Sequence, residues 1–312
     1  MTGSIVVTLF EKHYQAGVAA LVNSLYLAGF RGEVWAGFRG DLPDWAKSAV
    51  QESVSTFVFK AAEGLNLRFI KLETEQPLYY YKARFFYDVL RQNQEFERLF
   101  YFDPDIVVTE RWQMFEDWIK PGLALSLDYL YALESTNPKR NVWIDFCKSR
   151  NIEILHNFDV YLNSGFIGID VRYAEFLKQW ERLNLEIVAH IGSTGLKHGN
   201  LNDAFHMPDQ DALNIALMTT DVPYSFADAM GFRAPHQSNY MYHAMGRRKP
   251  WQSNKILATL RNEVPISISA ERAFFRFCRE PISIYSPLAY ELMQLDRKIS
   301  VLLDRLFRGK RP

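Results

Sequence analysis

The chain has 312 residues, 48% of them hydrophobic and 15% aromatic, which is enough to bury the core of a large globular α/β domain. Its 36 Lys and Arg residues balance its 36 Asp and Glu residues. This absence of net charge argues against nucleic acid as a partner. The two cysteines, Cys147 and Cys278, lack the spacing of a zinc site and cannot form a disulfide framework, which is typical of a reducing compartment.

Apolar runs of strand length alternate with helical patterns in the first third of the chain. The patterns predict strands at residues 5–9, 33–37, 56–60 and 68–71. They predict helices at residues 16–28, 44–53 and 80–92. Such alternation is typical of a mostly parallel sheet covered by helices.

The middle of the chain continues this α/β pattern. Strands are predicted at residues 99–102, 124–127 and 160–170, helices at 171–190 and 209–218, and a loop at 192–207. The strand at 160–170 contains Asn163, Ser164 and Gly165. Polar residues and glycine weaken a central strand, so we expect a ligand or another backbone to approach closely there.

The C-terminal region has a different character. Leucine and isoleucine recur with helical spacing over residues 290–312, where six basic residues accompany three acidic ones. Two interpretations stay open: a helix docked on the domain, or a helix lying on an anionic membrane. We therefore divide the chain into an α/β domain, residues 1–255, and a helical extension, residues 256–312, whose candidate partners are a membrane and another subunit.

Neither a signal-peptide pattern at the N-terminus nor an apolar run of about eighteen residues is present in the sequence. We therefore expect a cytoplasmic protein, with a peripheral location on the inner face of the membrane as the alternative.

Two aspartates follow the apolar strand at 99–102 directly, in the segment Asp103-Pro104-Asp105. Side chains at i and i+2 of an extended segment point the same way, so both carboxylates can bind one cation. Ligands of open α/β sheets bind beyond the carboxyl ends of strands, where these aspartates are expected to lie. The segment therefore predicts a divalent metal site.

A second segment, residues 243–251, supplies complementary groups. His243 is a candidate metal ligand, Gly246 lets backbone approach a ligand, and Lys249 can contact a phosphate as a point charge. A divalent cation that bridges two phosphates neutralises a departing diphosphate. Together the two segments predict an enzyme that uses nucleotide sugars.

Four motifs resemble glycosyltransferase family eight, which includes glycogenin and bacterial lipopolysaccharide galactosyltransferases. They are His-x-x-Gly-x-x-Lys-Pro-Trp at 243–251, Asp-x-Asp at 103–105, Asn-Ser-Gly at 163–165 and Asp-Gln-Asp-Ala-Leu-Asn at 209–214. The resemblance covers residues 4–251 in the family's order. It implies a GT-A fold with a Rossmann-like sheet, a UDP-sugar donor, Mn²⁺ or Mg²⁺ as cofactor, and retention of anomeric configuration.

The resemblance also implies individual roles. The metal ligands would be Asp103, Asp105 and His243. The nucleotide would contact Thr8, Leu9 and Tyr14 at the uracil, Gly246 and Lys249 at the diphosphate, and Arg84 near the phosphates or sugar. The catalytic residues that line the donor sugar would be Asp128, Asn163, Asp209 and Gln210, with Gln210 near the anomeric carbon.

The expected reaction is transfer of a hexose to a hydroxyl of a glycan or lipid-linked acceptor, as in polysaccharide or lipopolysaccharide biosynthesis. Two alternatives stay open. An inverting GT-A glycosyltransferase would need a carboxylate base opposite the leaving group. A non-catalytic protein would bind the carbohydrate or nucleotide without turnover.

Overall fold

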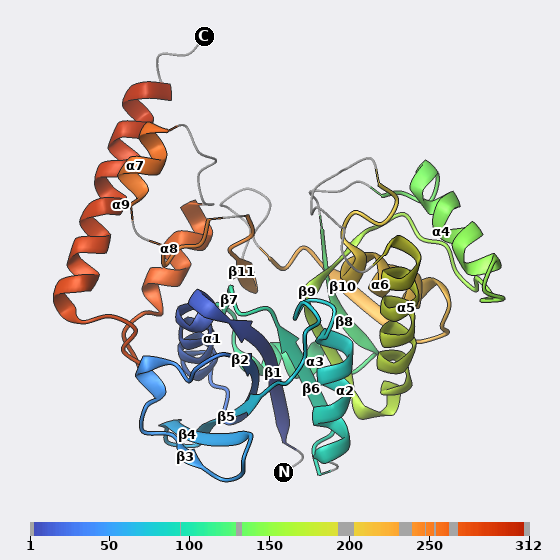
Figure 1. Ribbon diagram of the computed structural model, residues 1–312, viewed down its shortest axis with the longest axis horizontal. Coiled ribbons are helices and arrows are strands. Elements are labelled where there is room, and N and C mark those ends of the chain that lie inside the picture. Colours follow the sequence, from blue (N-terminus) through green and yellow to red (C-terminus); the bar gives the residue numbers. More distant parts are fainter. Residues whose placement is uncertain are drawn as a thin grey trace.

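A computed structural model describes residues 3–93, 95–128, 133–192, 203–230, 239–246, 248–252, 254–261 and 268–308. Within these residues, nine strands form one sheet with helices on both faces (Figure 1). Its order is β10 (Tyr224–Ala227), β8 (Leu123–Leu127), β9 (Leu162–Asp170), β6 (Arg98–Phe102), β1 (Ser4–Glu11), β2 (Gly32–Arg39), β5 (Leu65–Lys71), β4 (Thr56–Ala62) and β3 (Val50–Gln51). A separate antiparallel pair joins β7 (Ile106–Val108) to β11 (Met241–His243).

The large sheet is mixed but mostly parallel. Among the described strands, β9 and β4 run against the common direction of the other seven. The helices are α1 (Gln15–Leu27), α2 (Lys82–Gln92), α3 (Trp112–Trp118), α4 (Pro138–Lys148), α5 (Glu175–Ile191), α6 (Pro208–Met218), α7 (Lys255–Leu260), α8 (Ile268–Arg276) and α9 (Pro287–Arg308). This architecture confirms the predicted fold class, a mostly parallel sheet flanked by helices with a helical C-terminal segment.

Both faces of the sheet are buried. In β1, Val7 packs in the core formed with α2, α5 and α6, whereas Val6 packs in the core formed with α1 and α3. Both residues are fully buried. A strand covered on both faces needs apolar residues at successive positions rather than alternating ones, which explains the continuous apolar run of β1.

The predicted helix at residues 44–53 is wrong. A short 3-10 helix, Asp44–Ala46, occupies its start, and Val50 and Gln51 form β3. The Trp45 ring packs edge-on against Phe59 and at a tilt against Phe69. Pairing of β3 with the edge of β4 thus overrides the local helical pattern.

The other predicted elements are present with shifted ends. The predicted helix at 171–190 begins with a 3-10 turn, Val171–Tyr173, before α5. In the predicted loop at 192–207, residues 193–202 lie outside the described part of the chain, as do residues 309–312 at the end of the predicted C-terminal helix.

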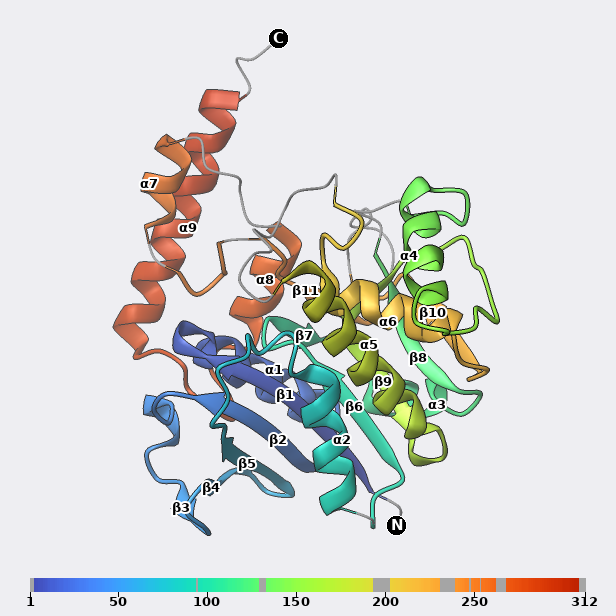
Figure 2. The ribbon, with the colours of Figure 1, turned by 45° about the vertical axis from the view of Figure 1, so that its right-hand side comes forward.

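The C-terminal helices pack against α1 and β7. Phe274 and Phe277 share a core cluster with Ala20 of α1 and Val107 of β7. The buried amide of Asn23 donates to the carbonyls of Phe277 and Ile282 at 2.8 Å. α9 lies along the outer edge of the molecule (Figures 1 and 2). The division of the chain at residue 255 stays a prediction.

The outward face of α9 is rich in leucine. Its exposed leucines are Leu288, Leu292, Leu295, Leu302 and Leu306, each more than half exposed. Among the helices in the described residues, none combines the length and the apolar character that crossing a membrane requires.

Candidate active site

Three side chains from two distant segments of the chain meet at the carboxyl end of β6. Asp103 and Asp105 lie in the turn from β6 to β7, and His243 ends β11, which pairs with β7 at Ile106. Nε2 of His243 lies 3.1 Å from Oδ1 of Asp105 and 3.8 Å from Oδ2 of Asp103. One ligand atom of each residue lies within 4.8 Å of the other two. Pairing of β11 with β7 therefore places His243 beside the two aspartates.

The backbone fixes this turn. The Asp103 N–H donates to the Gly165 carbonyl at 2.7 Å, and the Ala244 N–H donates to the Asp105 carbonyl at 2.9 Å. A Cβ atom on Gly165 would lie 2.8 Å from Cε1 of His243 and 2.9 Å from Oδ2 of Asp103. A larger residue at 165 would therefore displace the two side chains.

The donor set suits a divalent cation. Two carboxylates with one imidazole match the ligand preferences of Mn²⁺, and oxygen-rich sites also bind Mg²⁺. Asp105 and His243 are nearly buried, with 7% of each side chain exposed. The residues present therefore fit the predicted metal site.

Two buried lysines contact the same carboxylates. Nζ of Lys82 lies 3.0 Å from Oδ1 of Asp103 and 3.1 Å from Oδ2 of Asp209. Nζ of Lys249 lies 2.6 Å from Oδ2 of Asp105 and donates to the Ala244 carbonyl at 2.9 Å. Each lysine side chain is 7% exposed. The cluster is therefore a network of opposite charges largely removed from water.

These contacts keep the charged groups ionised. Burial alone would raise the pKa of Asp105, but His243 and Lys249 hold that pKa well below its usual range. Burial alone would lower the pKa of Lys82, but Asp103 and Asp209 raise it. Lys249 is affected in the same way, since Asp105 raises its pKa against the effect of burial. The site thus places the ionised Asp105 carboxylate beside two ammonium groups.

A network of amides and carboxylates borders this cluster. Oδ2 of Asp128 accepts hydrogen bonds from Nδ2 of Asn163 at 3.0 Å and Nε2 of Gln210 at 2.9 Å. Oε1 of Gln210 accepts from the Ser164 N–H at 3.1 Å, and the Ser164 hydroxyl donates to Asp209 at 2.8 Å. The structure therefore brings together all four residues predicted to line the donor sugar.

The triplet Asp209-Gln210-Asp211 does not form a second metal pair. It lies in α6, where residues i and i+2 do not face each other. Asp209 contacts Lys82, whereas Asp211 accepts from the Tyr161 hydroxyl at 2.6 Å and the Met207 N–H at 3.0 Å. Burial raises the pKa of Asp211 to about 8.

Of the residues predicted to bind the nucleotide, some are buried in β1 and one lies close to Lys249 and Trp251. Thr8 and Leu9 are buried in β1. The Tyr14 ring packs edge-on against Trp251, with 5.5 Å between ring centroids, and Nζ of Lys249 lies 5.6 Å from the centroid of the Tyr14 ring. Gly246 follows β11 with φ of +105°, a conformation that favours glycine.

Arg84 lies apart from the cluster. Half of its side chain is exposed, and it pairs with Asp88 at 2.8 Å and Glu181 at 3.3 Å. Lys82, two residues earlier in α2, points into the site instead. Sequence reasoning missed Lys82, although its spacing to Phe85, Phe86 and Val89 places it on the buried face of α2.

No protein-family model and no curated protein sequence matches the chain. Among solved structures, the ligand-free WbbM bifunctional glycosyltransferase is similar with a TM-score of 0.54 and 13% identity, covering 91% of this chain and 51% of WbbM. The chain thus spans about half the length of WbbM. The galactosyltransferase LgtC, solved with donor and acceptor sugar analogs, is similar with a TM-score of 0.53 and 16% identity, covering 93% of this chain and 99% of LgtC. These similarities confirm the predicted GT-A type fold.

Proposed function

We propose that the protein is a metal-dependent glycosyltransferase that moves a hexose from a UDP-sugar to a hydroxyl of a glycan or lipid-linked acceptor. The observation that carries this proposal is the convergence of Asp103, Asp105, His243 and Lys249 at one end of a GT-A type sheet. The names of the two similar structures support it, because both are glycosyltransferases and one was solved with donor and acceptor analogs.

Asp103, Asp105 and His243 would hold Mn²⁺ or Mg²⁺. The bound cation supplies positive charge that stabilises the departing diphosphate. Lys249 would add its ammonium group to the same phosphates, and Gly246 would let the backbone approach them. Thr8, Leu9 and Tyr14 are our candidates for contact with the uracil. A basic side chain is also expected near the phosphates or the sugar. For this role we favour Lys82 over Arg84, because Lys82 contacts Asp103 whereas the Arg84 side chain is half exposed to solvent.

The donor sugar would lie beside Asp128, Asn163, Asp209 and Gln210. Both polar atoms of the Gln210 amide have partners, Asp128 and the Ser164 N–H, which hold the amide in one orientation. An amide is a weak nucleophile, so we propose that Gln210 stabilises charge near the anomeric carbon and forms no covalent intermediate. A phosphate oxygen of the leaving group would accept the proton of the acceptor hydroxyl.

His243 provides the sharpest test of the metal site. His243→Ala should lower Mn²⁺-dependent turnover of UDP-sugars at least about 10-fold, because removing a ligand weakens the hold on the cation. Initial rates over a Mn²⁺ titration measure this effect. His156→Ala, which alters a half-exposed histidine, is the control. Wild-type turnover of the His243 variant at low Mn²⁺ would refute the ligand role.

Retention is favoured over inversion because the nearby carboxylates are already engaged. Asp209 contacts Lys82 and Ser164, and Asp128 accepts from two amides. An α-linked donor should therefore give an α-linked product, measured by the anomeric proton coupling in NMR spectra. A β-linked product would establish the inverting alternative. Tight nucleotide binding with neither transfer nor hydrolysis would favour the non-catalytic alternative.

We also propose that α9 contacts the membrane on its cytoplasmic face, where a lipid-linked acceptor would be presented. The exposed leucines of α9 supply an apolar face. The excess of basic residues over residues 290–312 complements anionic headgroups.

Flotation with anionic phospholipid vesicles tests this contact in the full chain. The triple variant Leu292→Gln, Leu295→Gln, Leu302→Gln should lose more than about 10-fold in vesicle binding, because each buried leucine contributes about 1.5–3 kcal/mol. Leu185→Gln, at a half-exposed position of α5, is the control. Equal flotation of the wild type and the triple variant would exclude the contact.

A further inference from the structure

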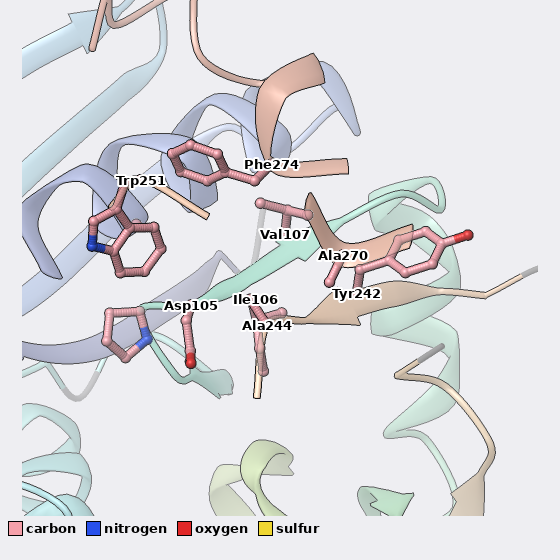
Figure 3. A pocket seen from close by; sticks show the side chains of 10 residues that line it. Asp105, Ile106, Val107, Tyr242, Ala244, Trp251, Ala270 and Phe274 are labelled. Atoms are coloured by element: carbon pink, nitrogen blue, oxygen red, sulfur yellow. The ribbon is translucent and has the colours of Figure 1, made fainter. Parts of the chain in front are cut away.

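The turn formed by residues 249–252 lies between the candidate metal site and the C-terminal helices. On one side, Nζ of Lys249 contacts Asp105 at 2.6 Å. On the other, the Trp251 ring packs against Phe274 of α8, with 5.3 Å between ring centroids. Figure 3 shows Trp251 and Phe274 around the same pocket as Asp105. The C-terminal region thus packs directly behind the metal site.

A buried ion pair holds this turn from the C-terminal side. Nζ of Lys255, in α7, donates to the Pro250 carbonyl at 2.8 Å and to the Glu271 carboxylate of α8. Only 5% of the Lys255 side chain and 8% of the Glu271 side chain are exposed. In α9, Asp296 accepts from the N–H groups of Lys255 and Ile256 at 2.8 and 3.1 Å. Groups from all three C-terminal helices therefore meet at Lys255, which contacts Pro250.

Burying the Lys255–Glu271 ion pair costs folding free energy that an apolar pair would not. Removing two charges from water opposes folding, and an apolar pair of similar volume often packs with equal or greater stability. An apolar pair cannot, however, donate a hydrogen bond to the Pro250 carbonyl. The feature that only the ion pair provides is a directed contact with the residue after Lys249.

We infer that Lys255 and Glu271 are positioning residues for Lys249. Glu271 orients the Lys255 ammonium group, which fixes the Pro250 carbonyl and with it the backbone from which Lys249 reaches Asp105. The consequence for diphosphate binding rests on the proposed function. On this account, the C-terminal helices are part of the donor-binding apparatus.

The double variant Lys255→Met, Glu271→Leu separates positioning from stability. It removes the contact with Pro250 but leaves an apolar pair, so its melting temperature should stay within about 4 °C of the wild type. Affinity for UDP with Mn²⁺, measured by calorimetry, should fall about 10-fold, while uridine affinity stays unchanged. Amide hydrogen exchange of the non-proline residues in segment 248–252 should become faster without nucleotide, because the turn loses a fixed partner.

Two further variants complete the experiment. Lys255→Arg keeps the cation and its donors and should retain UDP affinity. Glu291→Gln, which removes an exposed ion pair between Glu291 of α9 and Arg279, should leave UDP affinity and hydrogen exchange unchanged. Unchanged exchange of residues 248–252 in the double variant would overturn the inference, as would equal losses of UDP and uridine affinity. A wild type that binds no UDP would refute the proposed function alone, since hydrogen exchange still decides the positioning role.

Discussion

The site depends on a balance of charge at the carboxyl end of β6, where carboxylates are held together away from water. Asp103 and Asp105 are two residues apart in the chain and would repel each other if they were alone. Lys82 and Lys249 offset this repulsion from two separate elements, and His243 lies beside both carboxylates. Bringing these three side chains to one place requires the packing of α2, the pairing of β11 with β7, and the turn that carries Lys249. In the proposed function, the same carboxylates would hold a divalent cation, and Lys249 would add its ammonium group to the phosphates of the donor.

Much of this arrangement could be predicted from sequence, because a local run of apolar residues shows where a buried strand lies and where it ends. The apolar run before Asp103 indicates a buried strand, and the end of such a strand is where α/β proteins bind ligands. The same reasoning distinguishes the two Asp-x-Asp triplets once their secondary structure is known. In the turn after β6 both carboxylates lie beside His243, although the sequence predicted an extended segment there, whereas in α6 the two carboxylates contact Lys82 and Tyr161.

The roles that sequence did not locate depend on helix rotation and on tertiary packing. Lys82 and Arg84 are two residues apart, and α2 turns one into the site and the other towards Glu181. The family pattern drew attention to Arg84, whereas the apolar periodicity of α2 favoured Lys82. The contact of Lys255 with Pro250 and Glu271 joins segments that no local pattern connects. The helix expected at 44–53 is absent because an edge strand offers Val50 and Gln51 backbone partners.

The most direct test of the central claim is the position of the metal itself. Crystals grown with Mn²⁺ and UDP would be measured at a wavelength where manganese scatters anomalously. The account predicts one strong anomalous peak within about 2.0–2.4 Å of an oxygen of Asp103, an oxygen of Asp105 and a ring nitrogen of His243. A peak elsewhere, or one that leaves the imidazole beyond bonding distance, would contradict it.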